Sequence, residues 1–125
     1  MLNKIKINQF IDIELIFIIA IAALLRIVLL SNLTLSIDEA SNAYDAYSIG
    51  ETLRDQHGQF LPVFLEGIGV DARESLYIFM SVPFIKILGL NEFSARLPAA
   101  VIGIITVFVI YQLTKVYFDR NTALI

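Results

Sequence analysis

ARLPAAVIGIITVFVIYQLTKVY, residues Ala95 to Tyr117, is the clearest membrane-span candidate in the sequence. Its centre, from Ala99 to Leu113, carries no charged residue. About 20 consecutive apolar residues cross the hydrocarbon core of a bilayer as a helix, so the stretch predicts a transmembrane helix over 95–117. Ser94 is expected to cap its start, and Pro98 is tolerated in a first turn, where amide donors have no partner anyway.

The composition of the whole chain agrees with a membrane protein. Of its 125 residues, 58% are hydrophobic, and the mean hydropathy is +0.77. Soluble domains contain about 45–50% apolar residues. The formal net charge of −3 does not favour a nucleic-acid partner. The chain has no cysteine, which excludes disulfides and thiolate metal sites.

A second apolar run lies near the N-terminus, from Leu15 to Leu30, and predicts a first span over about 11–30. A cleaved signal peptide is the alternative. Asp12 and Glu14 occupy the place where such a peptide carries positive charge, and no small-residue cleavage site follows closely, so a retained span is favoured. Arg26 lies about one turn from the outer end, where its side chain can reach the headgroups or pair with a loop carboxylate.

A third apolar stretch, Leu76 to Leu90, is shorter than a membrane span. It has 15 residues and contains Pro83 and Lys86. We therefore expect it to lie along the membrane surface or in a protein crevice.

The basic residues predict the orientation of the two spans. Lys4 and Lys6 precede the first span, and Lys115 and Arg120 end the second. Because basic flanks stay in the cytoplasm, we expect a protein of the plasma (inner) membrane with both termini on the cytoplasmic side. The loop over about 31–93 would then be external or periplasmic. It holds nine of the twelve acidic residues: Asp38, Glu39, Asp45, Glu51, Asp55, Glu66, Asp71, Glu74 and Glu92.

Within this loop the sequence predicts one more helix. From Ser36 to about Gln56, apolar residues recur at three- and four-residue intervals and define one face (Ile37, Ala40, Tyr44 and Tyr47). Gly58 is a plausible stop. Residues 59–73 contain Pro62, Gly67 and Gly69 and are expected to be irregular.

The predicted fold class is therefore an all-α integral membrane protein. Two transmembrane helices flank an external loop that carries two surface-lying helices, and residues 122–125 begin a third apolar helix. One domain fits this length.

Two adjacent carboxylates, Asp38 and Glu39, follow the first span. Ser36 and Glu39 have the spacing of a capping box, and acidic groups in a first turn interact favourably with the helix dipole. Local structure thus accounts well for Glu39. It tolerates Asp38 without requiring it.

Several short motifs along the chain carry a resemblance. In order, they are Asp38-Glu39, Leu76-Tyr77, Pro83, Gly89, Asn91-Glu92-Phe93 and Arg96-Leu97-Pro98. From about Leu15 to Ile125 the chain resembles the N-terminal part of GT-C glycosyltransferases, which use lipid-phosphate-linked sugars. Protein O-mannosyltransferases (glycosyltransferase family 39) and the aminoarabinose transferases of lipid A belong to this class.

The resemblance implies roles for individual residues. Asp38 would be the general base on the acceptor hydroxyl, and Glu39 would assist by holding the acceptor or a metal. Arg96 would face the lipid phosphate or anchor the helix start, and Tyr44 would contact substrate. Glu74 matches a metal-binding glutamate of some relatives, although Ser75 replaces the proline that usually follows. A divalent metal ion is the one cofactor that the resemblance allows.

The predicted function is transfer of a sugar from a polyprenyl-phosphate carrier to an acceptor hydroxyl on the external face. The acceptor could be a lipid, a protein or a glycan. Because members of the class continue through many more spans, the chain is expected to be a fragment that does not catalyse alone. Two alternatives remain: a small two-span membrane protein that braces or binds a partner, and a fragment of a transporter or polysaccharide polymerase.

Overall fold

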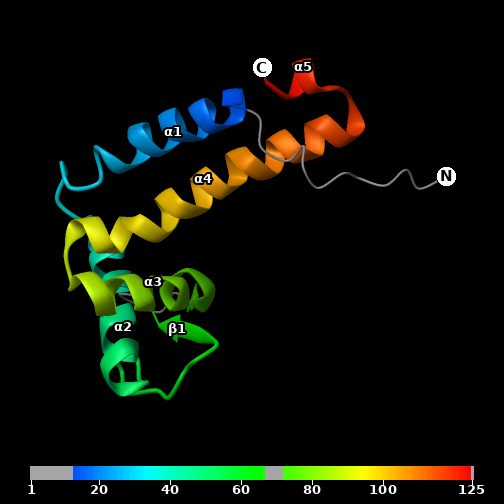
Figure 1. The fold of residues 1–125 in the computed structure, drawn as a ribbon. Coiled ribbons are helices and arrows are strands. Elements are labelled where there is room, and N and C mark those ends of the chain that lie inside the picture. The colour runs from blue at the N-terminus through cyan, green and yellow to red at the C-terminus, as the bar shows by residue number, and fades with distance from the viewer. Residues whose placement is uncertain (1–12, 67–71, 125) are drawn as a thin grey trace. The chain divides into compact units, whose positions relative to one another are not determined.

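The computed structural model describes residues 13–66 and 72–124. The chain forms two compact units, one from Met1–Arg26 with Val101–Ile125 and one from Ile27–Ala100. Figure 1 shows the order of the elements along the chain. Predictions that concern residues 1–12, 67–71 and 125 lie outside the described residues; they include the start of the first span, Lys4 and Lys6, and the two glycines at 67 and 69.

The first unit contains helices α1 and α5 and the part of helix α4 that follows Ala100. Helix α4, Glu92–Tyr117, has 26 residues. Within the described part of the chain it is the one helix that is long and apolar enough to cross a membrane. The second predicted span is therefore a helix of sufficient length. Helix α1, Ile13–Ile27, has 15 residues, about 22 Å at the helical rise, and its role as a first span stays a prediction. Short helix α5, Arg120–Ala123, follows Asp119 as its cap.

The second unit begins with helix α2, Ile37–Thr52. Ser36 caps it, and the Ser36–Glu39 capping box predicted from the sequence is confirmed. The predicted end of the helix was wrong. The chain leaves the helix at Leu53, whose φ is 59° and whose N–H donates to the carbonyl of Ile49, so no glycine is used at the stop.

Helix α2 packs against helix α3, Ser75–Leu88 (Figure 1). The core joins Ala43, Ala46 and Ile49 of α2 to Ile78 and Ile85 of α3. The aromatic face that the sequence pattern singled out, with Tyr44 and Tyr47, is exposed instead. Small alanine side chains allow close approach of two helices, whereas the tyrosines would hold them apart.

Two short strands form a hairpin where the sequence predicts irregular chain. Strands β1, Phe64–Glu66, and β2, Ala72–Glu74, are antiparallel, and Leu65 pairs with Arg73. Leu65 is 1% exposed and belongs to the core with α2 and α3. The fold is therefore mostly helical, and the all-α prediction misses this two-stranded element.

A compact turn joins α3 to α4. Gly89 has φ 79°, which an L-side chain rarely adopts. The N–H of Asn91 donates to Ser94 Oγ at 3.2 Å, and the N–H of Ser94 donates to Asn91 Oδ1 at 2.9 Å. The predicted cap was therefore misplaced: Asn91 lies directly before α4, and Ser94 lies within its first turn. Pro98 consequently falls in the second turn of α4.

Candidate functional site

Arg96 joins the start of α4 to the start of α2. Its Nε and Nη2 donate to the two carboxylate oxygens of Glu39, both at 2.9 Å. Its Nη1 donates to the carbonyls of Leu30 and Leu33 at 2.9 and 2.8 Å, and Nη2 also donates to that of Thr34 at 3.1 Å. A guanidinium has five N–H donors. All five therefore have acceptors inside the protein.

This geometry favours anchoring over phosphate binding for Arg96, which were the two roles that the sequence left open. Glu39 is equally occupied, because it also accepts the N–H of Ser36 at 2.9 Å. The hydrogen bonds from Arg96, followed by that from the Ser36 backbone, lower the pKa of Glu39 to about 2. Glu39 is thus a permanently charged structural carboxylate at neutral pH.

Asp38 is the neighbour of Glu39 and has a different environment. It lies in the first turn of α2 and is exposed. Its carboxylate makes no hydrogen bond or ion pair with any residue that the structure describes. Of the two adjacent acids, Asp38 alone keeps both carboxylate oxygens available to a ligand.

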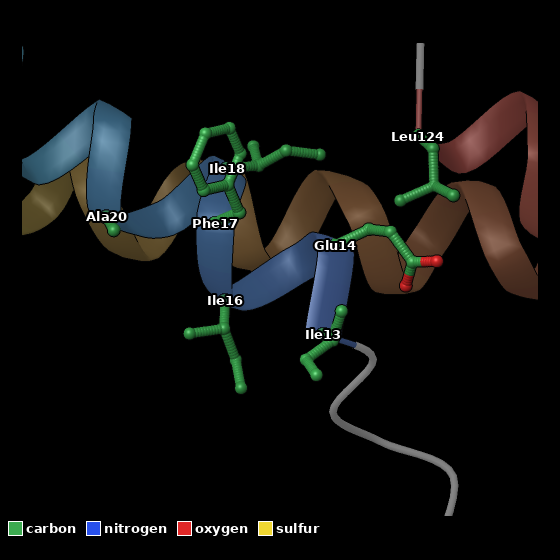
Figure 2. Close-up of a pocket in the computed structure, with 7 residues that line it drawn as sticks. All are labelled: Ile13, Glu14, Ile16, Phe17, Ile18, Ala20 and Leu124. Carbon is green, nitrogen blue, oxygen red and sulfur yellow. The ribbon is translucent and has the colours of Figure 1, made fainter.

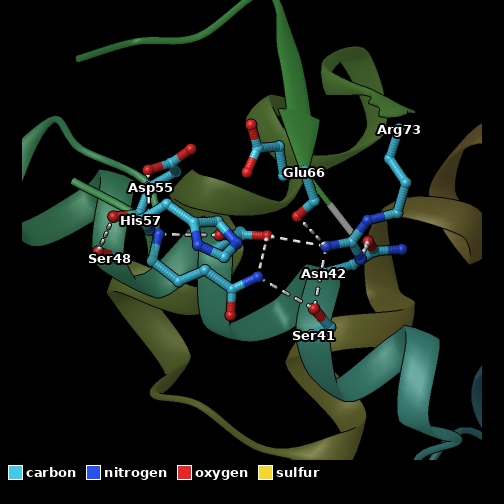
Figure 3. A network of polar contacts seen from close by, with 9 residues as sticks. Ser41, Asn42, Ser48, Asp55, His57, Glu66 and Arg73 are labelled. Atoms are coloured by element: carbon cyan, nitrogen blue, oxygen red, sulfur yellow. Dashed lines mark hydrogen bonds and ion pairs between the residues drawn. The ribbon is translucent and has the colours of Figure 1, made fainter. Parts of the chain in front are cut away.

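A buried polar network that includes Ser41 and Asn42 of α2 is shown in Figure 3. These two residues follow Asp38 by about one turn of the helix. Asp45 is 0% exposed. Its Oδ2 accepts from Arg73 Nη2 at 3.2 Å, and its Oδ1 accepts the N–H of Gln56 at 3.0 Å. Arg73 Nη2 also donates to Ser41 Oγ at 3.0 Å, and Nη1 donates to Asn42 Oδ1. Arg73 therefore fastens the hairpin to α2.

The network holds more negative than positive charge. Asp55 is 3% exposed, and its Oδ1 accepts the N–H groups of His57 and Gln59 at 2.9 and 2.8 Å. Its Oδ2 has no partner among the described residues. Burial raises the pKa of Asp45, against the lowering effects of the hydrogen bond from the Gln56 backbone and of the charge of Arg73; the charge of Asp55 adds a smaller increase. The network thus contains two buried carboxylates, of which Asp45 alone is ion-paired with Arg73.

Sequence reasoning missed this network. Asp45 and Arg73 are 28 residues apart, and nothing in either local sequence indicates that they meet. The only available signal was the spacing of Asp38, Asn42 and Asp45, which places three polar side chains on one side of a helix.

The structure places the remaining predicted site residues apart from this arrangement. Tyr44 is 50% exposed on α2, with its ring centroid 6.4 Å from that of Tyr47. Glu74 pairs with Phe64 through its backbone in β2, but its side chain is outside the described residues. No group of three histidine or acidic residues able to hold a metal ion occurs in the part that is described. The metal prediction stays a prediction.

Arg26 belongs to the first unit and contacts no carboxylate among the described residues. Its Nη1 donates to the carbonyl of Ala22 at 3.3 Å. Its side chain also lies over Gly103 of α4, where an added Cβ would stand 2.5 Å from Arg26 Nε. Pairing of Arg26 with a loop carboxylate, one of its two predicted roles, stays a prediction.

The first unit also has an open apolar hollow, formed by one side of α1 and Leu124 (Figure 2). Its lining is Ile13, Glu14, Ile16, Phe17, Ile18, Ala20 and Leu124. Glu14, its one ionisable member, is ion-paired with Arg120 at 2.8 Å. This hollow offers apolar contact and no group for chemistry.

Comparison with known proteins gives a family match for the C-terminal part of the chain, which contains Arg96. Residues 76–125 match the family model described as dolichyl-phosphate-mannose-protein mannosyltransferase. This segment is mannosyltransferase-like. The resemblance to GT-C glycosyltransferases is thereby confirmed for α3, α4 and α5, about two fifths of the chain. The mannosyltransferase-like segment contains Arg96 and the turn between α3 and α4. Asp38 and Glu39 lie before residue 76, outside this segment. No curated protein and no solved structure matches the chain.

Proposed function

We propose that the chain is part of a membrane glycosyltransferase that moves a sugar from a polyprenyl-phosphate carrier to an acceptor hydroxyl on the external face. Asp38 would act as the general base. The proposal rests on one observation above all: Asp38 is an exposed carboxylate with no partner among the described residues, beside a glutamate that is fully engaged. The mannosyltransferase-like segment supports the reaction class.

The chemistry needs a free carboxylate. As the acceptor oxygen bonds to the anomeric carbon, its proton passes to Asp38, and the bond from that carbon to the phosphate oxygen breaks. The polyprenyl phosphate leaves with the electron pair. A positioned general base contributes typically 10²–10⁴-fold to such a step. Glu39, with a pKa of about 2 and two donors from Arg96, is a poor proton acceptor at neutral pH.

Glu39 and Arg96 are assigned positioning roles. The guanidinium holds the capping box of α2 against the first turns of α4, so the helix turn that carries Asp38 has one fixed place beside the start of the candidate span. Because all five donors of Arg96 are used internally, the leaving phosphate must be stabilised by another cation. This assignment replaces the contact with lipid phosphate and the contact with acceptor predicted for these two residues.

The outer side of α3 supports a place at the membrane surface. Leu76, Met80 and Ile87 recur at helical spacing and are 71%, 39% and 80% exposed. Lys86 does not interrupt this stripe, because its Nζ turns to α2 and donates to the carbonyl of Gly50 at 2.7 Å. An apolar stripe of this kind suits the boundary between headgroups and acyl chains.

The test is a substitution at the chromosomal locus followed by a transfer assay on isolated membranes. Asp38→Asn keeps the size of the side chain and removes its basicity, so transfer of radiolabelled sugar from a polyprenyl-phosphate donor should fall at least about 10²-fold. The amount of protein in the membrane should stay unchanged.

Glu51→Gln is the matched control, since Glu51 is another exposed carboxylate on α2. It should leave transfer unaffected. Full activity in the Asp38→Asn membranes would overturn the proposal. Loss of activity and protein together in Asp38→Asn would assign Asp38 a structural role at the start of α2.

A further inference from the structure

We propose that Asn42 and Asp38 form a two-point site for adjacent hydroxyls of a sugar, so that the acceptor is a carbohydrate. This inference rests on the proposed function and names its acceptor class. The observations that carry it are the fixed orientation of the Asn42 amide, its position one turn after Asp38, and the charge of the surrounding network.

Arg73 fixes the orientation of the Asn42 side chain. Arg73 Nη1 donates to Asn42 Oδ1. A guanidinium only donates, so the amide oxygen must face Arg73 and the amide nitrogen must face away. Asn42 is half-buried, and its Nδ2 has no acceptor among the described residues. The side chain therefore presents an N–H donor that is held in place and unused.

Asp38 and Asn42 are neighbours on the surface of α2. Residues four apart on a helix have Cβ atoms about 5–6 Å from one another. Side chains on a helix also lean toward its N-terminus, which brings the Asn42 amide toward Asp38. The unused N–H of Asn42 and the unused carboxylate of Asp38 are therefore on one face of α2, one turn apart.

Adjacent hydroxyls on a sugar ring match this pair. One hydroxyl donates to Asp38 and later loses its proton there, while the oxygen of the next accepts from Asn42 Nδ2. A serine or threonine residue has a single hydroxyl, and its peptide carbonyls are joined to that hydroxyl through freely rotating bonds. A sugar ring holds its two neighbouring oxygens at a fixed spacing, so it loses less conformational freedom when it pairs with both groups.

The local charge excludes an anionic ligand. Arg73 is already paired with Asp45 at 3.2 Å, and Asp55 is buried in the same network with one unpartnered oxygen. With Asp38 added, the neighbourhood has three carboxylates and one guanidinium. A phosphate group would meet net repulsion here, so the ligand carries no negative charge, which an unmodified sugar satisfies.

The test is NMR titration of the ¹⁵N-labelled chain in lipid nanodiscs, observing the side-chain amide of Asn42. Methyl α-mannoside should shift this signal saturably. An N-acetylated threonine amide and inorganic phosphate should bind at least about tenfold more weakly, the effect of one lost hydrogen bond. In Asn42→Leu the backbone amides of the first two turns of α2 should no longer respond to the mannoside, whereas in Asn121→Leu, which changes an exposed residue of α5, they should respond as in the unchanged chain.

Equal responses to the mannoside and the threonine amide, or no shift at Asn42 with any probe, would overturn the inference. If Asn42→Leu does not fold, as judged from its backbone amide spectrum, the probe comparison on the unchanged chain still decides. The titration does not depend on turnover. Mannoside binding together with full activity in Asp38→Asn would remove the proposed base and leave the carbohydrate site standing.

Discussion

At the scale of single residues, two neighbouring carboxylates have been given opposite environments. Glu39 receives the N–H of Ser36 and two N–H groups of Arg96, while Asp38 receives none from any described residue. Hydrogen bonds to a carboxylate stabilise its charged form and make it a weaker base. The sequence alone could identify the pair, but the partner that separates their roles lies 57 residues away from Glu39.

The titration of Glu39 tests this separation. Its folded-state pKa of about 2 lies below the ordinary value of 4.5. The group therefore stabilises the fold fully above pH 4.5, and this stabilisation is lost as the pH falls toward 2. The ¹³C chemical shift of the Glu39 side-chain carboxylate should titrate with a midpoint near pH 2. Arg96→Met should return the midpoint toward 4.5, whereas Ser36→Ala should raise it less, and an unchanged midpoint in Arg96→Met would contradict the assignment.

At the scale of elements, α2 shows what the sequence could and could not predict. The capping box depends on residues three apart, so the start of the helix could be predicted and is confirmed. The buried face depends on which partner helix arrives. Tyr44 and Tyr47 have the larger apolar surfaces, yet Ala43 and Ala46 are buried because they fit against α3.

The hairpin was beyond sequence prediction for a related reason. Its strands have three residues each, too few to show a two-residue alternation. Their pairing depends instead on Leu65 in the core and on the ion pair of Arg73 with Asp45. Both contacts are long-range.

Removal of the buried charge at position 45 tests how the hairpin is held. Asp45→Asn leaves Arg73 without its ionic partner, and breaking one side of a buried pair typically costs about 3 kcal/mol. We expect a loss of this order in the free energy of unfolding, and the backbone amides of the hairpin should exchange their hydrogens faster. The double replacement Asp45→Leu with Arg73→Met should cost less than Asp45→Asn, and a larger cost would contradict the charge argument.

The end of α2 offers a stabilising substitution. Leu53 is held at φ 59° with its side chain 52% exposed, a conformation that costs an L-residue about 1–2 kcal/mol. Leu53→Gly relieves this strain and should raise the midpoint of thermal unfolding. Leu76→Gly, at an exposed helical position of α3, should lower the midpoint by contrast. A decrease for both variants would show that the Leu53 side chain matters more than its backbone.

At the scale of the whole molecule, the proposal needs Asp38 on the external side of the membrane and the end of α4 on the other. Helix α4 has the length for a span, and the family of the mannosyltransferase-like segment agrees with a membrane location. The direction of crossing depends on the charge asymmetry of the flanks, which is a property of the sequence.

Cysteine labelling tests this direction directly. These 125 residues contain no cysteine, so each introduced thiol is the one thiol within them. In intact cells, Asp38→Cys should react with a membrane-impermeant maleimide, and Lys115→Cys should react only after the membrane is opened. The reverse pattern would place the base on the cytoplasmic side and end the proposal.

The hydrogen bonds from Arg96 to backbone carbonyls also have a consequence for sequence variation. Three of its five contacts are to carbonyl oxygens between Leu30 and Thr34, and every amino acid supplies the same carbonyl. Side chains in this short link can therefore change freely, but inserting or deleting one residue would carry the carbonyls out of reach. The link should tolerate substitution and reject any change of length.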